Sequence, residues 1–143
     1  MVIAQAEWQA YVQKVSGGEW PIPQGMIKDY DNWLCRSIVG RALYFRGDLE
    51  GAMRVLSTVV EVTPSAVVPK EGMSEVEHKI LCLRDLAKIV WQLTKNQGAA
   101  EKFWQEAIDL AQNWQAPFHS VELAELKQEE AAMLAEKIEN VER

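Results

Sequence analysis

Apolar residues recur at every third or fourth position through most of this chain, which is the spacing of one face of an α-helix. Six segments carry the pattern, and they cover approximately residues 3–15, 24–46, 49–62, 74–95, 99–113 and 117–141. None of them alternates apolar and polar residues in the way that a half-buried β-strand does. The pattern therefore predicts an all-α fold of about six helices.

Glycine, proline and capping residues separate the predicted helices. Gly47-Asp48 predicts a tight break, with Gly47 just past the end of one helix and Asp48 as the N-cap of the next. Pro64 ends the third helix, and Ser74 and Glu77 have the spacing of a capping box that opens the fourth. We therefore expect two antiparallel helical hairpins, over residues 24–64 and 74–113.

The chain also repeats itself. Residues 34–44 fall on residues 81–91 when they are shifted by 47 positions, so that Leu34-Cys35 matches Leu81-Cys82. Further along, Ala52 and Leu56 correspond to Ala100 and Trp104 at a shift of 48, since the second copy has one extra residue in its turn. Self-similarity at a period of tens of residues indicates stacked helical hairpins, which mostly bind other proteins.

The first copy resembles the tetratricopeptide repeat. In that pattern a large residue precedes a Leu-Gly pair and a Tyr, and an Ala, an aromatic residue and a Pro follow in the second helix. Residues at matching spacings occupy these places here: Arg36, Val39-Gly40, Leu43, Ala52, Leu56 and Pro64. The second copy departs further, because Ala87, Val90 and Gln112 stand where the pattern has Gly, Tyr and Pro.

The resemblance implies a single helical-repeat domain over residues 1–143, a short right-handed tetratricopeptide-like solenoid of stacked antiparallel hairpins. Residues 1–23 and 117–143 have no match and are expected to form an N-terminal capping helix with its Pro loop and a C-terminal capping helix. A helical bundle without repeat ancestry is the alternative, because any bundle has apolar residues at helical spacing.

Small residues in the repeat predict where helices approach closely. We expect contacts between Gly40 and Ala52 in the first hairpin and between Ala87 and Ala100 in the second. The expected core is apolar residues on the inner helix faces: Leu34, Ile38, Leu43, Leu56, Val59, Leu83, Leu86, Val90, Trp104 and Ile108.

Composition narrows the function classes. With a net charge of −6 and a pI near 5.0, the chain lacks the basic balance of a nucleic-acid binder, so no nucleic-acid partner is expected. No apolar run is long enough to cross a bilayer, and the N-terminus does not resemble a signal peptide. Cys35 and Cys82 lie within apolar helical patterns, as buried free thiols do in a reducing compartment. These features predict a cytoplasmic protein without a membrane partner.

Catalytic motifs are not apparent. His78 and His119 have no neighbours at metal-ligand spacing, and Gly17-Gly18 lacks the context of a phosphate-binding loop. Acidic pairs such as Asp29 and Asp31 lie at helix starts, where they favour the positive end of the helix dipole. We therefore expect no enzyme activity, no catalytic residue, no metal and no cofactor.

The resemblance does imply a candidate peptide-binding groove. In tetratricopeptide proteins the first helix of each hairpin lines a concave surface, and the corresponding residues here are Ser37, Arg41, Tyr44, Arg84, Lys88 and Trp91. Their spacing of i, i+4 and i+7 places each set of three on one helix face. Three cations and two aromatic rings suit a protein or peptide partner with acidic side chains. A purely structural role, in which the cations solvate a helix face and both rings are core, is the alternative.

Two other function classes remain open. Trp8, Trp20 and Trp114 lie outside the core pattern and could cover an apolar patch in a homodimer. The helical stack could also be the peptide or small-ligand sensor of a larger system. Glu129-Glu130, in the last predicted helix, is expected to lie on a solvated face.

Overall fold

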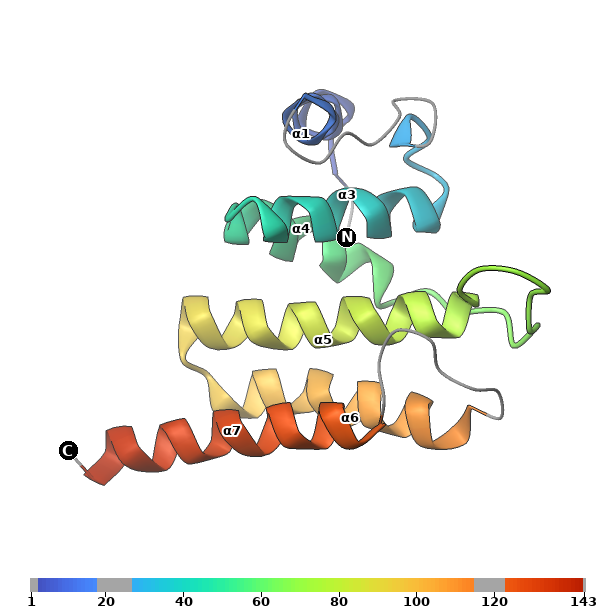
Figure 1. Cartoon of the computed structure of the whole chain (residues 1–143). Coiled ribbons are helices and arrows are strands. Elements are labelled where there is room, and N and C mark those ends of the chain that lie inside the picture. The colour runs from blue at the N-terminus through green and yellow to red at the C-terminus, as the bar shows by residue number, and fades with distance from the viewer. Residues whose placement is uncertain (1–2, 18–26, 115–122, 143) are drawn as a thin grey trace. The chain divides into compact units, whose positions relative to one another are not determined.

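A computed structural model describes residues 3–17, 27–114 and 123–142, with side chains as far as Glu136 in the last stretch. Six helices and no strand are found in these ranges, which confirms the all-α prediction (Figure 1). The helices are α1 (Gln5–Ser16), α3 (Trp33–Phe45), α4 (Leu49–Val59), α5 (Glu75–Thr94), α6 (Gln97–Asn113) and α7 (Leu123–Glu142).

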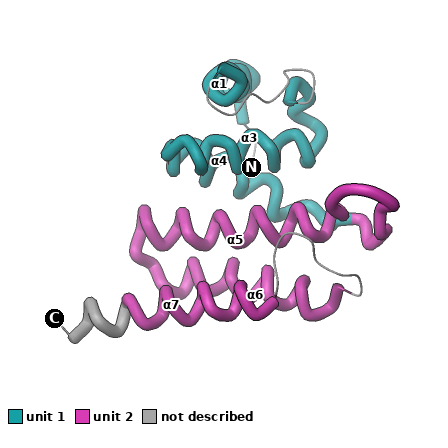
Figure 2. Tube along the Cα trace, viewed as in Figure 1, with its two compact units in different colours: residues 1–64 teal, residues 65–143 magenta. Residues whose placement is uncertain are grey.

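The chain divides into two compact units, Met1–Pro64 and Ser65–Arg143 (Figure 2). The first contains α1, α3 and α4, and the second contains α5, α6 and α7. In each unit one pair of consecutive helices has the most extensive contact, α3 with α4 in the first and α5 with α6 in the second. These pairs coincide with the two hairpins that the sequence predicts.

The turn between α3 and α4 follows the prediction for Gly47-Asp48. Gly47 has a φ of 85°, its N–H donates to Tyr44 O, and Asp48 N–H donates to Leu43 O, which is a Schellman ending. The carboxylate of Asp48 then accepts the Gly51 N–H at 3.1 Å as the N-cap of α4. The two helices can therefore reverse direction within three residues.

One helix start in each hairpin differs from the prediction. The second predicted helix begins at residue 24, whereas α3 begins at Trp33, because the side chain of Asn32 accepts the Leu34 N–H at 3.0 Å and caps the helix there. Residues 28–32 before it are not helical. Residues 18–26, which include Trp20 and Pro23, lie outside the described residues, and so does the predicted start of the last helix at 117. Asn96 likewise caps α6, so this helix begins at Gln97, two residues before the predicted start at Ala99.

Gly40 makes a close approach in the first hairpin, and the atoms nearest to it belong to Leu56 and Val55. A Cβ placed on Gly40 would lie 2.6 Å from Leu56 Cδ2 and 3.3 Å from Val55 Cγ1, so these side chains occupy the space beside it. Ala52 is fully buried, but none of the three atoms nearest to a Cβ placed on Gly40 belongs to it. The small residue therefore makes room for a leucine one helical turn beyond Ala52.

Most of the predicted core is buried. Eight of its ten members are buried: Leu43, Leu56, Val59, Leu83, Leu86, Val90, Trp104 and Ile108. Leu34 and Ile38 are wrong, since both are only half-buried. The buried face of α3 is carried instead by Ser37, Val39, Gly40, Ala42 and Leu43, because small residues allow α4 to approach on that side.

Side-chain pairs hold α1 in the first unit. Arg54 of α4 donates from Nε to Glu7 Oε1 at 3.1 Å, and Lys14 donates to Asp48 Oδ2 at 2.6 Å. The hydrogen bonds from Arg54 and Tyr11 lower the pKa of the Glu7 carboxyl. The pKa of Asp48 is also lowered, because the hydrogen bonds from Lys14 and Gly51 outweigh the effect of burial, which raises it.

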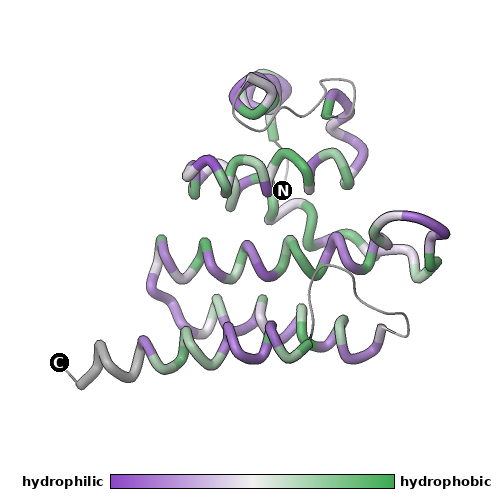
Figure 3. Tube along the Cα trace, in the orientation of Figure 1, coloured by the Kyte–Doolittle hydropathy of each residue, from purple (hydrophilic) through white to green (hydrophobic). Residues whose placement is uncertain are grey.

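The second unit is a bundle of three helices. In Figure 1, α7 lies beside α6 and runs in the direction opposite to it. Figure 3 shows hydrophilic residues along much of the described part of α7, whereas twelve of the twenty residues of α5 are buried. The helix predicted to be a simple cap therefore packs along the hairpin with a mostly polar surface.

Candidate helix-binding face

The six predicted groove residues lie three on α3 and three on α5, one row in each unit. The α3 row does not form a common surface. Ser37 is 1% exposed, and its hydroxyl finds no partner among the described residues. Arg41 lies over the ring of Phe45 at 5.6 Å, and the Tyr44 and Phe45 rings are 5.4 Å apart. Two of the three residues thus lean on Phe45, which is 53% exposed, while Ser37 points into the hairpin.

The α5 row is covered by α7. Trp91 is 7% exposed, and the side chains of Arg84 and Lys88 are 15% and 33% exposed. Each of the three contacts a carboxylate of α7, and Arg84 also lies 3.8 Å from the buried carboxylate of Asp85. The row that resembles a peptide-binding face is therefore occupied by a helix of the same chain.

The covering helix presents a matching acidic row. Glu125 and Glu129 each have an oxygen 3.8 Å from Arg84 Nη1, and Glu129 also pairs with Lys88. About two turns further on, Glu136 accepts the Trp91 indole N–H at 3.2 Å and lies 3.7 Å from Lys95 Nζ. Cations of α5 thus alternate with carboxylates of α7 along the whole contact.

The prediction that Glu129-Glu130 is a solvated face is wrong. Both residues are half-buried, because Glu129 faces α5 and Glu130 accepts a hydrogen bond from Gln105 of α6. The signal that could have found this contact is the spacing of acids in the last helix, i, i+4 and i+11, which matches the cations of α5. Sequence alone does not show that these two helices are neighbours.

Lys95 supports the same contact from an unusual backbone position. It is the C-cap of α5 with φ 54°, the left-handed region that a side chain rarely adopts. From there its ammonium group reaches 4.8 Å from the centroid of the Trp91 ring. A cation–π contact and an ion pair to Glu136 therefore meet at one end of the row.

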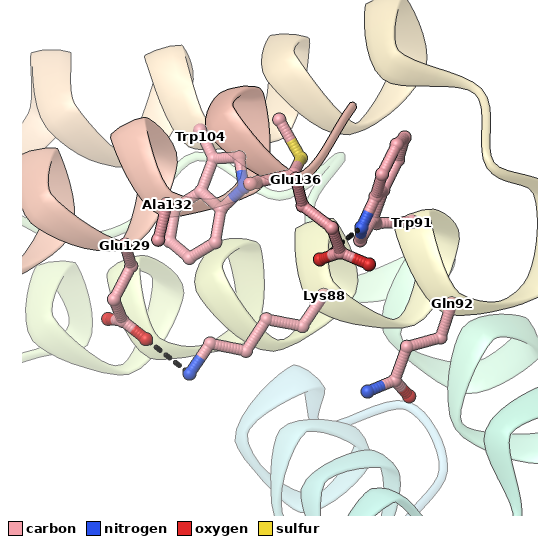
Figure 4. Close-up of a pocket in the computed structure, with 8 residues that line it drawn as sticks. Lys88, Trp91, Gln92, Trp104, Glu129, Ala132 and Glu136 are labelled. Carbon is pink, nitrogen blue, oxygen red and sulfur yellow. Dashed lines mark hydrogen bonds and ion pairs between the residues drawn. The ribbon is translucent and has the colours of Figure 1, made fainter. Parts of the chain in front are cut away.

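An open pocket of about 270 Å³ lies at the surface where α7 meets the hairpin (Figure 4). Its walls are Lys88, Trp91, Gln92, Trp104, Glu129, Ala132, Met133 and Glu136. Trp104 is 2% exposed, and its indole N–H has no acceptor among the described residues. Ala132 is itself exposed, so the pocket is a surface hollow beside α7 in which a larger side chain at this position would find room next to two tryptophans.

Metal and thiol chemistry gain no support from the described residues. They contain no group of three His, Cys, Asp or Glu side chains that could hold a metal ion, and His119 lies outside them. Cys82 is buried, Cys35 is half-buried, and both are free thiols. Burial raises the pKa of Cys35, which makes its thiolate less abundant at neutral pH.

The tryptophans proposed for a dimer contact give a mixed result. Trp8 is 4% exposed and packs edge-on against Tyr30 at 5.1 Å, so it belongs to the core of the first unit. Trp114 is half-buried, and Trp20 lies outside the described residues.

Comparison with protein-family models, with curated proteins and with solved structures gives no match for this chain. The tetratricopeptide resemblance therefore rests on the residues of the chain itself. Among the described helices, none combines the length and the apolar character needed to cross a bilayer.

Proposed function

We propose that this chain is a non-catalytic protein-interaction module, built from tetratricopeptide-like hairpins, that binds a partner helix or peptide rich in carboxylates. The observation that carries the proposal is the α5 row: Arg84, Lys88 and Trp91 all hold carboxylates that come from another helix. The partner chemistry is thus the chemistry that these side chains already bind within the chain.

Charge supports this choice of partner. The chain has 15 Lys and Arg against 21 Asp and Glu, so a row with two cations and a third cation one turn beyond is a local exception. Charge-assisted hydrogen bonds to carboxylates are stronger than neutral ones, and complementary charge selects one partner over another. Neither Cys35 nor Cys82 is in a disulfide bond, which favours a reducing compartment, so we include a cytoplasmic location in the proposal.

The test compares two synthetic helical peptides that differ only in charge. One carries Glu at i, i+4 and i+11, and the other carries Gln at the same positions. Fluorescence anisotropy with the full chain, titrated to about 1 mM, should show binding of the Glu peptide roughly tenfold tighter than the Gln peptide. Salt should weaken only the former.

A pair of charge-matched variants localises the binding. Arg84→Glu with Lys88→Glu should weaken capture of the Glu peptide, whereas Lys70→Glu with Lys102→Glu, at two exposed lysines elsewhere, should not. Circular dichroism checks that each variant is folded, which matters because Arg84 is engaged in ion pairs. Equal binding of the two peptides, or equal capture by both double variants, would reject the proposal.

A further inference from the structure

The contacts between α7 and the hairpin of α5 and α6 are mainly polar. Among its described side chains, only Leu126 and Met133 are buried, at 0% and 6% exposure. They are seven residues apart, so they form a single narrow seam of two helical turns. Two buried side chains are few for a helix of twenty residues, so the apolar contribution to its attachment is small.

Polar pairs flank the seam on both sides. Toward α5 they are the contacts of Glu125, Glu129 and Glu136 described above, and toward α6 the contact is between Glu130 and Gln105. Ion pairs and hydrogen bonds at partly exposed positions stabilise a contact only weakly, because water and salt screen them. An interface made of a thin apolar seam and exposed ion pairs can open without unfolding the hairpin beneath it.

The pocket beside Ala132 offers a partner helix an additional contact with which it could compete against α7. Ala132 is exposed and lines an open pocket of about 270 Å³ together with Trp91 and Trp104. A helix with a larger apolar residue at that position would fill the space and gain the dispersion contacts that α7 leaves unmade. The site therefore favours an occupant that is similar to α7 but bulkier at one position.

We infer that α7 is a built-in occupant of the partner site, and that an acidic amphipathic helix of a partner protein replaces it on α5 and α6. The inference rests on the proposed function and specifies both its partner and its regulation. The partner helix has acids at i, i+4 and i+11, matching Glu125, Glu129 and Glu136, and apolar residues at i+1 and i+8, matching Leu126 and Met133.

Competition within one chain sets how tightly the partner binds. A tethered helix acts at an effective concentration of about millimolar. The apparent dissociation constant for a partner is raised by the inverse of the fraction of molecules in which α7 is released. Weakening the hold of α7 should therefore tighten binding of the partner without any change in the site itself.

The experiment uses the full chain and a fluorescent peptide with the sequence of residues 123–142. The loosened variant carries Glu125→Gln, Glu129→Gln and Glu136→Gln, and the control variant carries Glu101→Gln, Glu106→Gln and Asp109→Asn on α6. Each of the two variants loses three negative charges. We expect the loosened variant to bind the peptide about tenfold tighter than the unaltered chain, and the control to bind as the unaltered chain does.

Two further measurements show where the peptide sits. Hydrogen exchange should show that the α7 amides of the unaltered chain lose protection when the peptide binds, while the α5 and α6 amides keep theirs. The indole N–H signal of Trp91, which reports its bond to Glu136, should shift at the same time. A peptide with Phe at the position of Ala132 should bind more tightly than the peptide with the α7 sequence.

The outcomes separate the inference from the function on which it rests. Equal affinity of the loosened and control variants overturns the inference. Binding with unchanged protection of α7 also overturns it, while the proposed function stands. A doubling of mass in analytical ultracentrifugation means that a second copy is the occupant, which overturns it as well. Failure of every chain to bind either peptide at about 1 mM rejects both.

Discussion

At the scale of single residues, Gly40 carries the tightest constraint of the first hairpin. An alanine there would place its Cβ 2.6 Å from Leu56 Cδ2 and 2.7 Å from Leu56 Cγ. Leu56 is fully buried and has no room to move, so the clash should exceed the gain in helix propensity.

We therefore predict that Gly40→Ala lowers the free energy of unfolding by about 1–3 kcal/mol, and that Gly40→Leu lowers it further. Urea denaturation measures the change. Gly98→Ala is the matched control, since the nearest atom to its added Cβ is 3.7 Å away, and it should be neutral or stabilising by up to about 1 kcal/mol. Unchanged stability of Gly40→Ala would mean that the two helices are not in close contact here.

Tyr11 gives a pH signature. Burial, and then its hydrogen bond to the Glu7 carboxylate, raises the pKa of Tyr11 to about 12. In the unfolded chain a tyrosine ionises near pH 10, at about its ordinary value. The folded state therefore keeps the proton longer, and stability should fall as the pH rises from about 10 toward 12.

Absorbance at the tyrosinate band should follow this titration, and Glu7→Gln should lower the pKa of Tyr11 because it removes the nearby negative charge. Tyr11→Phe serves as the control, since it should abolish the high transition. A Tyr11 that ionises equally in both proteins would show that the pair is not formed in solution.

Residue identity predicts some contacts and misses others. Gly47 and Asp48 were predictable because each has a backbone role that few residue types can fill. Leu34 and Ile38 were not, because helical spacing fixes which residues share a face but leaves open how far the partner helix covers it. Ser37 is buried for the same reason, at a position where polarity predicted exposure.

At the scale of helices, α7 differs from the others in how it is held. Its ion pairs lie at partly exposed positions, where salt screens them, with a Debye length of about 3 Å at 1 M ionic strength. We predict that raising the salt concentration from about 0.05 M to about 1 M makes the α7 amides exchange roughly tenfold faster with deuterium.

The amides of α5 provide the internal control, because that helix is held by buried apolar residues and should not respond. Slower exchange of α7 at high salt would show that its apolar seam dominates.

The sequence predicted the existence of all six described helices, since periodicity and caps are local. It could not predict that α7 lies on the cationic row, because that contact joins residues about forty positions apart.

At the scale of the whole molecule, one described segment connects the two units without helix or strand. In residues 65–73, Val67 and Val68 are 72% and 61% exposed, the most exposed large apolar side chains described. Local bonds such as Ser65 N–H to Glu75 Oε1 at 3.1 Å are few, so the backbone can reach a protease active site.

We predict that thermolysin or elastase at low concentration cuts within residues 66–69 before it cuts any of the helices α3 to α6. Mass spectrometry of the first fragments identifies the site. As a control, Val67→Pro with Val68→Pro should slow that cut and leave the cleavage of other sites unchanged. A first cut inside either hairpin would show that the hairpins are less stable than the connection.

The polar contacts between α7 and α5 also have a mechanical consequence. Its contacts with α5 lie one after another along the helix, from Glu136 through Glu129 to Glu125. A pull from the C-terminal side of α7 would load them in that order, as in unzipping, rather than all at once as in shearing. The helix would then come away at low force in steps, while the hairpin of α5 and α6 stays folded.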